Sequence, residues 1–193
     1  EDISFAAGVK SKICKDWNWD LSNTFGRNDF HFYGDKTFNA SQISIPGSIR
    51  QTRFDDGGFN FLQNTTNLDV SKSFSKVASG LNLGLGAEFG YERYSICEGE
   101  LASFENFRKD PLYYPTAGDS LTPASGSQGF PGFTPEDAIK SDRNNISLYV
   151  DAELNATKEW LMDGAVRFEH YSDFGSVATF KFATRYKVTK DFN

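Results

Sequence analysis

The sequence predicts an all-β protein, an antiparallel meander of about seven long strands. Apolar and polar residues alternate with a period of two over long segments, which is typical of strands with one apolar and one polar face. Aromatic residues make up 16% of the 193-residue chain although hydrophobic residues total only 38%, so the apolar surface is diluted along the sequence. No uninterrupted apolar run exceeds three residues, which excludes a membrane-crossing helix of about 20 residues.

The first four expected strands lie in the N-terminal half of the chain. Weaker alternation marks three of them, at Ile3 to Val9, Trp19 to about Tyr33 and Phe59 to Phe74. The fourth runs from Leu81 to Ser95 and alternates clearly, with apolar residues at the odd positions as far as Tyr91. Three residues on its polar face are glycines: Gly84, Gly86 and Gly90.

The last three expected strands follow one another through tight turns. From Asn145 to Ala156 every even position is apolar, and every odd position carries a polar residue or a tyrosine. A turn at Thr157–Glu159 leads to a strand around Met162 to Phe168, and a turn near Asp173 leads to the last strand, Ala178 to Val188. Tight turns of this kind join antiparallel neighbours, so these three strands form a meander.

The connections between the expected strands alternate in length. Short turns lie near Cys14–Asp16, Lys76–Gly80 and Thr157–Glu159, whereas long connections span about residues 34–58 and 97–143. Outer-membrane barrels show this asymmetry, with short periplasmic turns and long extracellular loops. The longest connection is rich in proline, so no regular helix is expected in it.

Strand length favours a transmembrane barrel over a soluble β-sandwich, in which strands also alternate. Several expected strands run to a dozen residues or more, whereas soluble strands average about 5 to 6, and about 9 to 11 residues cross a bilayer. In a barrel the apolar face meets outer-membrane lipid and the polar face lines the lumen. The residues expected to face the lumen are Glu88, Glu92, Asp151, Glu153, Asp163, Arg167, Glu169, Lys181 and Arg185. Their opposite charges on neighbouring strands predict cross-strand ion pairs. The alternative to a transmembrane barrel is a soluble sheet with ordinary surface aromatic residues.

Two classes of function are disfavoured by the residues present. The chain carries 26 acidic and 20 basic residues, a net charge of -6 and no basic run, so nucleic acid is not an expected partner. The two histidines, His31 and His170, do not combine with a nucleophile or paired carboxylates into a catalytic constellation. We therefore expect no catalytic residue, no metal site, no cofactor and no enzymatic activity.

The two cysteines are not expected to pair with each other. Cys14 falls at a short turn and Cys97 just past the opposite end of an expected strand. An apolar band about 25 Å tall would separate them in a barrel. A disulfide requires Cα atoms within about 7 Å.

One segment near the C-terminus resembles a sequence motif of a known family. Residues 163–175, DGAVRFEHYSDFG, are similar to the strand and turn of TonB-dependent receptors usually written AVRYExYSDFG. Further similar segments follow the expected order: Asn67–Asp69, Gly86–Tyr94, Gly129–Phe133, Ser147–Asp151, and Lys181 with Ala183–Tyr186. Through these segments most of the chain resembles the barrel portion of a TonB-dependent outer-membrane receptor.

The resemblance implies a fold and a function for the whole protein. The fold is a 22-stranded barrel plugged by an N-terminal domain, and the function is active import of a scarce nutrient across the bacterial outer membrane. The nutrient would be a siderophore, cobalamin or an oligosaccharide, and the TonB complex would supply the energy. Seven strands cannot close such a barrel, so residues 1–193 are expected to be a fragment, without the plug domain and the remaining strands. A soluble all-β module that binds carbohydrate or another ligand is the alternative, and an outer-membrane barrel enzyme ranks third.

The expected ligand-contacting residues lie in the longest connection. They are Tyr113, Tyr114, Phe130 and Phe133, because aromatic groups on an outer loop meet a nutrient first. The alternative for Phe130 and Phe133 is that they pack the long loop onto the barrel rim.

Overall fold

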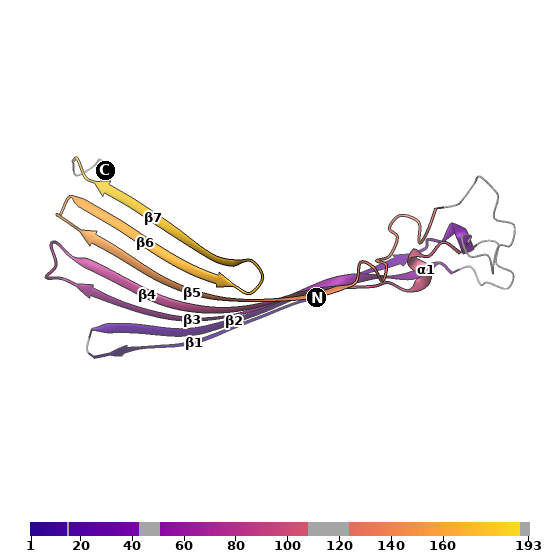
Figure 1. Cartoon of the computed structure of the whole chain (residues 1–193), viewed down its shortest axis with the longest axis horizontal. Coiled ribbons are helices and arrows are strands. Elements are labelled where there is room, and N and C mark those ends of the chain that lie inside the picture. Colours follow the sequence, from indigo (N-terminus) through magenta and orange to yellow (C-terminus); the bar gives the residue numbers. More distant parts are fainter. Residues whose placement is uncertain (15, 43–50, 108–123, 190–193) are drawn as a thin grey trace. The chain divides into compact units, whose positions relative to one another are not determined.

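A computed structural model of the chain describes residues 1–14, 16–42, 51–107 and 124–189. Seven strands form one sheet in chain order (Figure 1), and this confirms the predicted meander. The strands are β1 (Asp2–Ile13), β2 (Trp17–Asp35), β3 (Arg53–Phe74), β4 (Leu81–Cys97), β5 (Ile139–Asn155), β6 (Trp160–Tyr171) and β7 (Gly175–Tyr186). The two helical segments are η1 (Ala40–Gln42) and α1 (Leu101–Phe104). Neither helix of the described residues has the length and apolar character needed to cross a membrane.

The strand boundaries differ from the sequence prediction next to the long connections. β3 begins at Arg53, earlier than the expected Phe59, and β5 begins at Ile139, earlier than the expected Asn145. Alternation does not mark the start of β3 because Asp55, Asp56, Gly57 and Gly58 follow one another, and Gly57 has a φ of 80° that interrupts the regular strand. The connections therefore span residues 36–52 and 98–138, less than the expected 34–58 and 97–143.

The expectation of no helix in the longest connection was wrong at its start. α1 is a single turn of four residues, and Glu105 N donates to the carbonyl oxygen of Leu101 at 2.9 Å. The first proline of this connection is Pro111, so none interrupts this turn.

The chain divides into two compact units. The loop-bearing unit comprises Glu1–Ile3, Arg27–Leu62 and Arg93–Ser141. The strand unit comprises Ser4–Gly26, Gln63–Glu92 and Asp142–Asn193. Each unit is described separately below.

In the strand unit the apolar side chains are exposed on one face of the sheet. Val150 of β5 lies opposite Val166 of β6, which in turn lies opposite Phe180 of β7. These side chains are 46%, 46% and 77% exposed. The neighbouring row on the same face, Leu148 and Phe168, is about half exposed as well. A sheet that leaves its apolar face uncovered fits lipid contact on that face.

The described residues do not form the hydrophobic core that a soluble domain has. Phe54 is the one large apolar side chain that is buried in the described part of the chain. The other side chains that are almost fully enclosed there are polar, and they include Asn39, Asp56 and Ser147. A soluble β-sandwich places its apolar faces inside, so the burial pattern disfavours that alternative.

The glycines on the polar face of β4 make room for side chains from β5. A Cβ atom added at Gly86 would lie 2.0 Å from Cε1 of Tyr149. The tyrosine reaches across β4, and its hydroxyl donates to Asp69 Oδ1 of β3 at 2.5 Å. At Gly90 an added Cβ would lie 2.0 Å from Oδ1 of Asn145. Gly86 therefore permits a hydrogen bond between β5 and β3, which are not neighbours in the sheet.

Replacing Gly86 by alanine is expected to destabilise the full-length protein by about 1 to 3 kcal/mol, because the methyl group displaces the ring of Tyr149. The matched control is Gly84→Ala on the same face of β4, where an added Cβ meets nothing closer than 3.8 Å. Urea titration of the protein in lipid vesicles measures both free energies of unfolding. Equal effects at the two glycines would contradict the packing role assigned to Gly86.

Candidate functional site

Arg167 is the centre of a polar network on the predicted lumen face of the strand unit. Its Nη2 donates to Glu88 Oε1 of β4 at 3.0 Å, and its Nε donates to Glu169 Oε1 at 2.9 Å. The side chain of Arg167 extends from β6 past β5, which lies between β6 and β4 in the sheet. Ser147 Oγ of β5 also donates to Glu169 Oε1, at 3.1 Å. One cation therefore joins two carboxylates that the sequence assigned to the same face.

Other residues predicted to face the lumen form separate contacts. Lys181 Nζ of β7 lies 2.7 Å from Asp163 Oδ2 of β6, which confirms that cross-strand ion pairs form on this face. Glu153 accepts a hydrogen bond from Asn82 Nδ2 at 3.0 Å. Glu92 accepts from Arg143 Nε at 3.0 Å. The second oxygen of Asp163, Oδ1, is buried without a hydrogen-bond partner among the described residues.

Asp151 and Arg185 share this face by register but stay outside the network. Asp151 of β5 lies opposite Ala165, and Arg185 of β7 lies opposite Leu161. Neither side chain forms an ion pair within the described part of the chain. The structure thus brings most of the predicted lumen residues into contact with one another, and leaves these two available.

In the loop-bearing unit, Asn39 joins the two long connections. Its Nδ2 donates to the carbonyl oxygens of Ala102 and Glu105, both at 2.9 Å. Its Oδ1 accepts from the Ser41 backbone N at 2.9 Å and from Ser41 Oγ at 2.6 Å. Asn39 is only 1% exposed, so these four hydrogen bonds are shielded from water.

A second polar contact ties the longer connection to the start of β3. Ser127 Oγ donates to Asp56 Oδ1 at 2.9 Å, and Ser127 also forms an isolated β-bridge with Asn39. Asp56 lies in the loop-bearing unit and is 2% exposed. Burial raises the pKa of the Asp56 carboxyl, and the Ser127 hydrogen bond offsets part of that effect.

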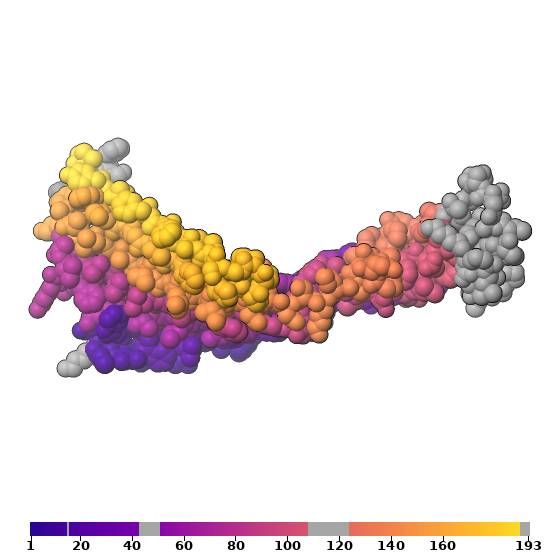
Figure 2. All heavy atoms as spheres, viewed as in Figure 1, coloured from indigo at the N-terminus to yellow at the C-terminus, as the bar shows by residue number. Residues whose placement is uncertain are grey.

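The backbone of the longer connection packs closely on itself. Ser127 N and Gly132 N both donate to the carbonyl oxygen of Ser103, at 2.9 and 3.0 Å. A Cβ atom at Gly132 would lie 2.0 Å from Ser103 Oγ, so only glycine fits there. Figure 2 shows the orange atoms of residues 124–138 against the pink atoms of residues 98–107. The described parts of this connection therefore form a compact structure.

An aromatic cluster lies beside these polar contacts, within the same unit. The ring centroids of Phe32 and Phe130 are 4.8 Å apart, and those of Phe32 and Phe133 are 6.1 Å apart. Phe59 stacks on Phe30 at 5.6 Å. We call this set, completed by Tyr94 at 6.4 Å from Phe59, the aromatic cluster.

The contacts of Phe130 and Phe133 support the alternative in which they pack the loop onto the strands. Phe130 is nevertheless 43% exposed, so part of its ring remains accessible. Tyr113 and Tyr114 lie outside the described residues. The other members, Phe30, Phe32, Phe59 and Tyr94, were not predicted from the sequence, although Phe30 and Phe32 stand two positions apart on one face of a strand.

The histidines and cysteines form no larger constellation. Among the described residues no group of three or more His, Cys, Asp or Glu side chains is arranged to hold a metal ion. His31 Nε2 lies 2.6 Å from Asp55 Oδ1, and His170 Nδ1 lies 2.9 Å from Ser176 Oγ. Cys14 and Cys97 are both free and exposed.

Comparisons with known proteins agree with this architecture. A family model described as "TonB dependent receptor-like, beta-barrel" matches residues 4–193. Among solved structures, the open form of the ferric-catecholate import receptor Fiu from E. coli K12 matches with a TM-score of 0.52 and 12% sequence identity. That match covers 98% of this chain and 33% of the Fiu chain, so the chain spans about a third of that receptor. No curated protein matches the sequence significantly.

The structural likeness shows the fold, and the family model, which extends over nearly the whole chain, shows the family. Members of this family are receptors of the bacterial outer membrane. The chain therefore belongs to the TonB-dependent receptor family, of which it represents the β-barrel portion.

Proposed function

We propose that the chain forms part of the wall and the outer loops of a receptor that actively imports a scarce nutrient across the bacterial outer membrane. The observation that carries this proposal is the pairing of an exposed apolar face with a polar network in a chain of this family. In the complete receptor the barrel has 22 strands. A plug domain and the TonB complex, which supplies the energy, complete the proposed import machinery.

The polar network is proposed to face the lumen and the plug. A wall that carries fixed charges next to a mobile plug provides hydrogen-bonding partners which water would otherwise supply. Asp151 and Arg185 form no ion pair with the described residues, so they have capacity for such contacts on this face. The cluster around Arg167, in which one cation pairs with two carboxylates, instead stabilises the wall itself.

The loop-bearing unit is proposed to lie on the extracellular side and to contact the nutrient. The aromatic cluster presents flat rings, which bind ligands that contain planar or apolar groups. A siderophore, cobalamin and an oligosaccharide are the candidate nutrients. Because Fiu is described as a ferric-catecholate receptor and catechol rings stack on phenylalanine, a ferric catecholate is the first ligand to test. Phe130, Phe133, Tyr113 and Tyr114 remain the proposed contact residues.

Growth of a strain that lacks the receptor gene tests the proposal. Cells are supplied with a ferric catecholate, cobalamin or an oligosaccharide as the sole source of iron, cobalamin or carbon. Wild-type receptor should restore growth on one of the three. Phe130→Ala should weaken binding of that nutrient by about five- to tenfold, which is the loss of one aromatic contact of about 1 to 1.5 kcal/mol.

Phe180→Ala is the control for that variant, because Phe180 is exposed on the apolar face of β7. It should bind the nutrient as tightly as wild type. If the wild-type receptor restored growth on none of the three nutrients, import of these three classes of nutrient would be refuted. If the full-length protein could be purified without detergent, the membrane barrel would be refuted. The soluble binding module would then be the favoured function.

A further inference from the structure

Ser127 Oγ lies between two hydrogen-bond acceptors of the loop-bearing unit. It is 2.9 Å from Asp56 Oδ1 and 2.6 Å from the carbonyl oxygen of Phe130. A hydroxyl group has one hydrogen, so it cannot donate to both oxygens at once. If Asp56 is ionised, Ser127 donates to the carboxylate, and the Phe130 carbonyl has no other donor among the described residues. These three oxygens are therefore one hydrogen short when Asp56 is a carboxylate.

A proton on Asp56 supplies the missing hydrogen. The protonated Oδ1 donates to Ser127 Oγ, and Ser127 then donates to the Phe130 carbonyl at the shorter of the two distances. The other carboxyl oxygen remains an acceptor for the backbone N–H of Gly34, which also hydrogen-bonds this side chain. Each of these groups then has a partner, as buried polar groups require.

The charges around Asp56 favour the neutral carboxyl as well. Burial is the largest cause that raises its pKa, and Asp55 of β3 and Glu100, which precedes α1, raise that pKa further. Residues 124–133, which pack on Asp56 through Ser127, contain no charged residue. The one contact of Asp56 on β2 is the uncharged backbone of Gly34.

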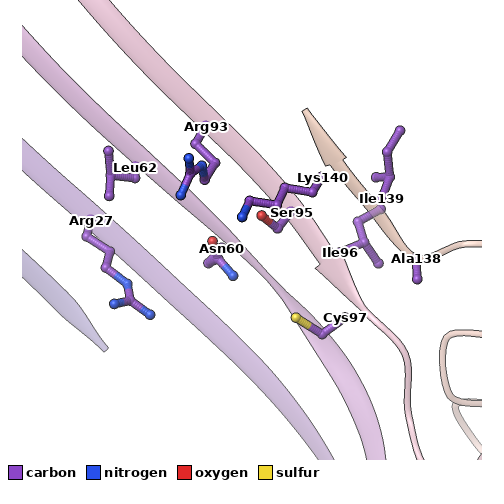
Figure 3. A pocket seen from close by; sticks show the side chains of 10 residues that line it. All are labelled: Arg27, Asn60, Leu62, Arg93, Ser95, Ile96, Cys97, Ala138, Ile139 and Lys140. Atoms are coloured by element: carbon purple, nitrogen blue, oxygen red, sulfur yellow. The ribbon is translucent and has the colours of Figure 1, made fainter. Parts of the chain in front are cut away.

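The cations of the same unit lie elsewhere. Arg27, Arg93 and Lys140 line an open pocket of about 580 Å³ that does not include Asp56 (Figure 3). His31 pairs with Asp55, at 2.6 Å. Asp56 therefore forms no ion pair within the described part of the chain, and a negative charge on it would be buried without compensation.

We propose that Asp56 holds a proton in this structure and acts as a pH-dependent switch, which ties residues 126–133 to β3 when it is neutral and releases them when it ionises. On ionisation the proton of Oδ1 passes to water, and the hydroxyl of Ser127 turns from the Phe130 carbonyl to the carboxylate. The charge must then be hydrated, so the segment moves away from a site that is 2% exposed.

The switch controls the position of two members of the aromatic cluster. Phe133 N donates to the carbonyl oxygen of Asp56 at 3.0 Å, and the Phe130 carbonyl accepts from Ser127. Release of residues 126–133 therefore moves both rings away from Phe32, which they contact in the tied form. An effect on nutrient binding rests on the proposed function, because that proposal makes Phe130 and Phe133 contact residues.

The tied form should lose stability as the pH rises. A carboxyl whose pKa is raised in the tied form binds its proton more tightly there than in the released form. The tied form is therefore most stable below the ordinary pKa of 3.8, and it weakens as the pH rises through the raised pKa of Asp56. Between these two values the protection of its amides should fall by up to about tenfold per pH unit.

Hydrogen–deuterium exchange of the Gly132 and Phe133 amides in the full-length protein, corrected for intrinsic exchange at each pH, tests the switch. Protection should fall with rising pH in wild type. Asp56→Asn supplies an N–H donor to Ser127 at every pH, so its protection should stay at or above the low-pH value of wild type. Ser127→Ala removes the link and should lower protection about two- to tenfold at low pH.

Glu136→Gln is the matched control, because it removes an exposed carboxyl of the same connection and should keep the pH dependence of wild type. The infrared band of a protonated carboxyl, absent from Asp56→Asn, should disappear over the same pH range as the protection. Protection that is independent of pH in wild type, or weaker in Asp56→Asn than in wild type at every pH, would overturn the proposal. None of these measurements uses the nutrient, so their failure is distinct from failure of import.

Discussion

Replacing Val150 by arginine is expected to lower the free energy of unfolding of the full-length receptor by about 2 to 4 kcal/mol. Val150 lies opposite Val166 of β6 in a row that continues to Phe180 of β7, and it is 46% exposed. In the proposed membrane placement, a guanidinium group there meets hydrocarbon and loses its hydration, which no polar neighbour in that row replaces. Urea titration of the receptor in lipid vesicles, followed by tryptophan fluorescence, measures the change.

Two control variants distinguish the effect of depth in the membrane from the effect of the face of the sheet. Ile146→Arg changes the same face near the end of the β5–β6 pairing, opposite His170, and should cost about 0 to 1 kcal/mol. Asp151→Leu changes the opposite face of β5 and removes no ion pair of the described residues, so it should cost less than about 1 kcal/mol. Normal stability of Val150→Arg together with a strongly destabilised Asp151→Leu would show that the two faces are inverted.

Replacing Asn39 by alanine is expected to lower the free energy of local opening of the loop-bearing unit by about 2 to 4 kcal/mol. The substitution removes four hydrogen bonds at a site that is 1% exposed. It leaves the carbonyl of Ala102 and the polar groups of Ser41 without that partner, and each buried unsatisfied group costs about 1 to 3 kcal/mol. Hydrogen–deuterium exchange of the amides of Ser103, Ser127 and Gly132 measures the opening.

Gln128→Ala is the matched control in the same connection. Gln128 Nε2 makes a single long hydrogen bond to the carbonyl oxygen of Gly126, at 3.3 Å, so its removal should leave exchange almost unchanged. The urea midpoint of the receptor should stay near that of wild type for Asn39→Ala as well. Retained protection of Ser127 in Asn39→Ala would mean that Asn39 does not hold the two connections together.

Strand number, strand order and the faces of the last three strands were predictable from the sequence. Alternation with a period of two is a local property. The face of the sheet on which Val150 or Asp151 lies can therefore be inferred from its immediate neighbours. For the charged residues, the sequence predicted partners only on adjacent strands. Arg167 was expected to pair across adjacent strands, whereas it reaches Glu88 two strands away in the sheet.

The interior of the loop-bearing unit was not predictable from local pattern. Thr37 Oγ1 donates to the carbonyl oxygen of Gln128 across 91 positions of the sequence, and Asn39 Nδ2 reaches Glu105 across 66. No periodicity encodes contacts between two irregular segments, and composition marks them only as loops. Only part of the aromatic cluster was predictable from the sequence. Phe130 and Phe133 are aromatic residues of a loop, whereas Phe32 lies within a strand, where aromatic residues are common.

The exposed apolar face has a consequence for how the chain reaches its native state. With Phe54 as the one large enclosed apolar side chain among the residues described, collapse in water gains little, because burial of apolar area drives that step. In the proposed membrane placement, the gain appears when Val150, Val166 and Phe180 enter hydrocarbon, where their backbone groups must be paired. Adjacent hairpins in chain order keep the loop-closure entropy of each pairing low. In that placement, folding and insertion are therefore expected to occur as a single process, and the chain is expected to reach the membrane unfolded.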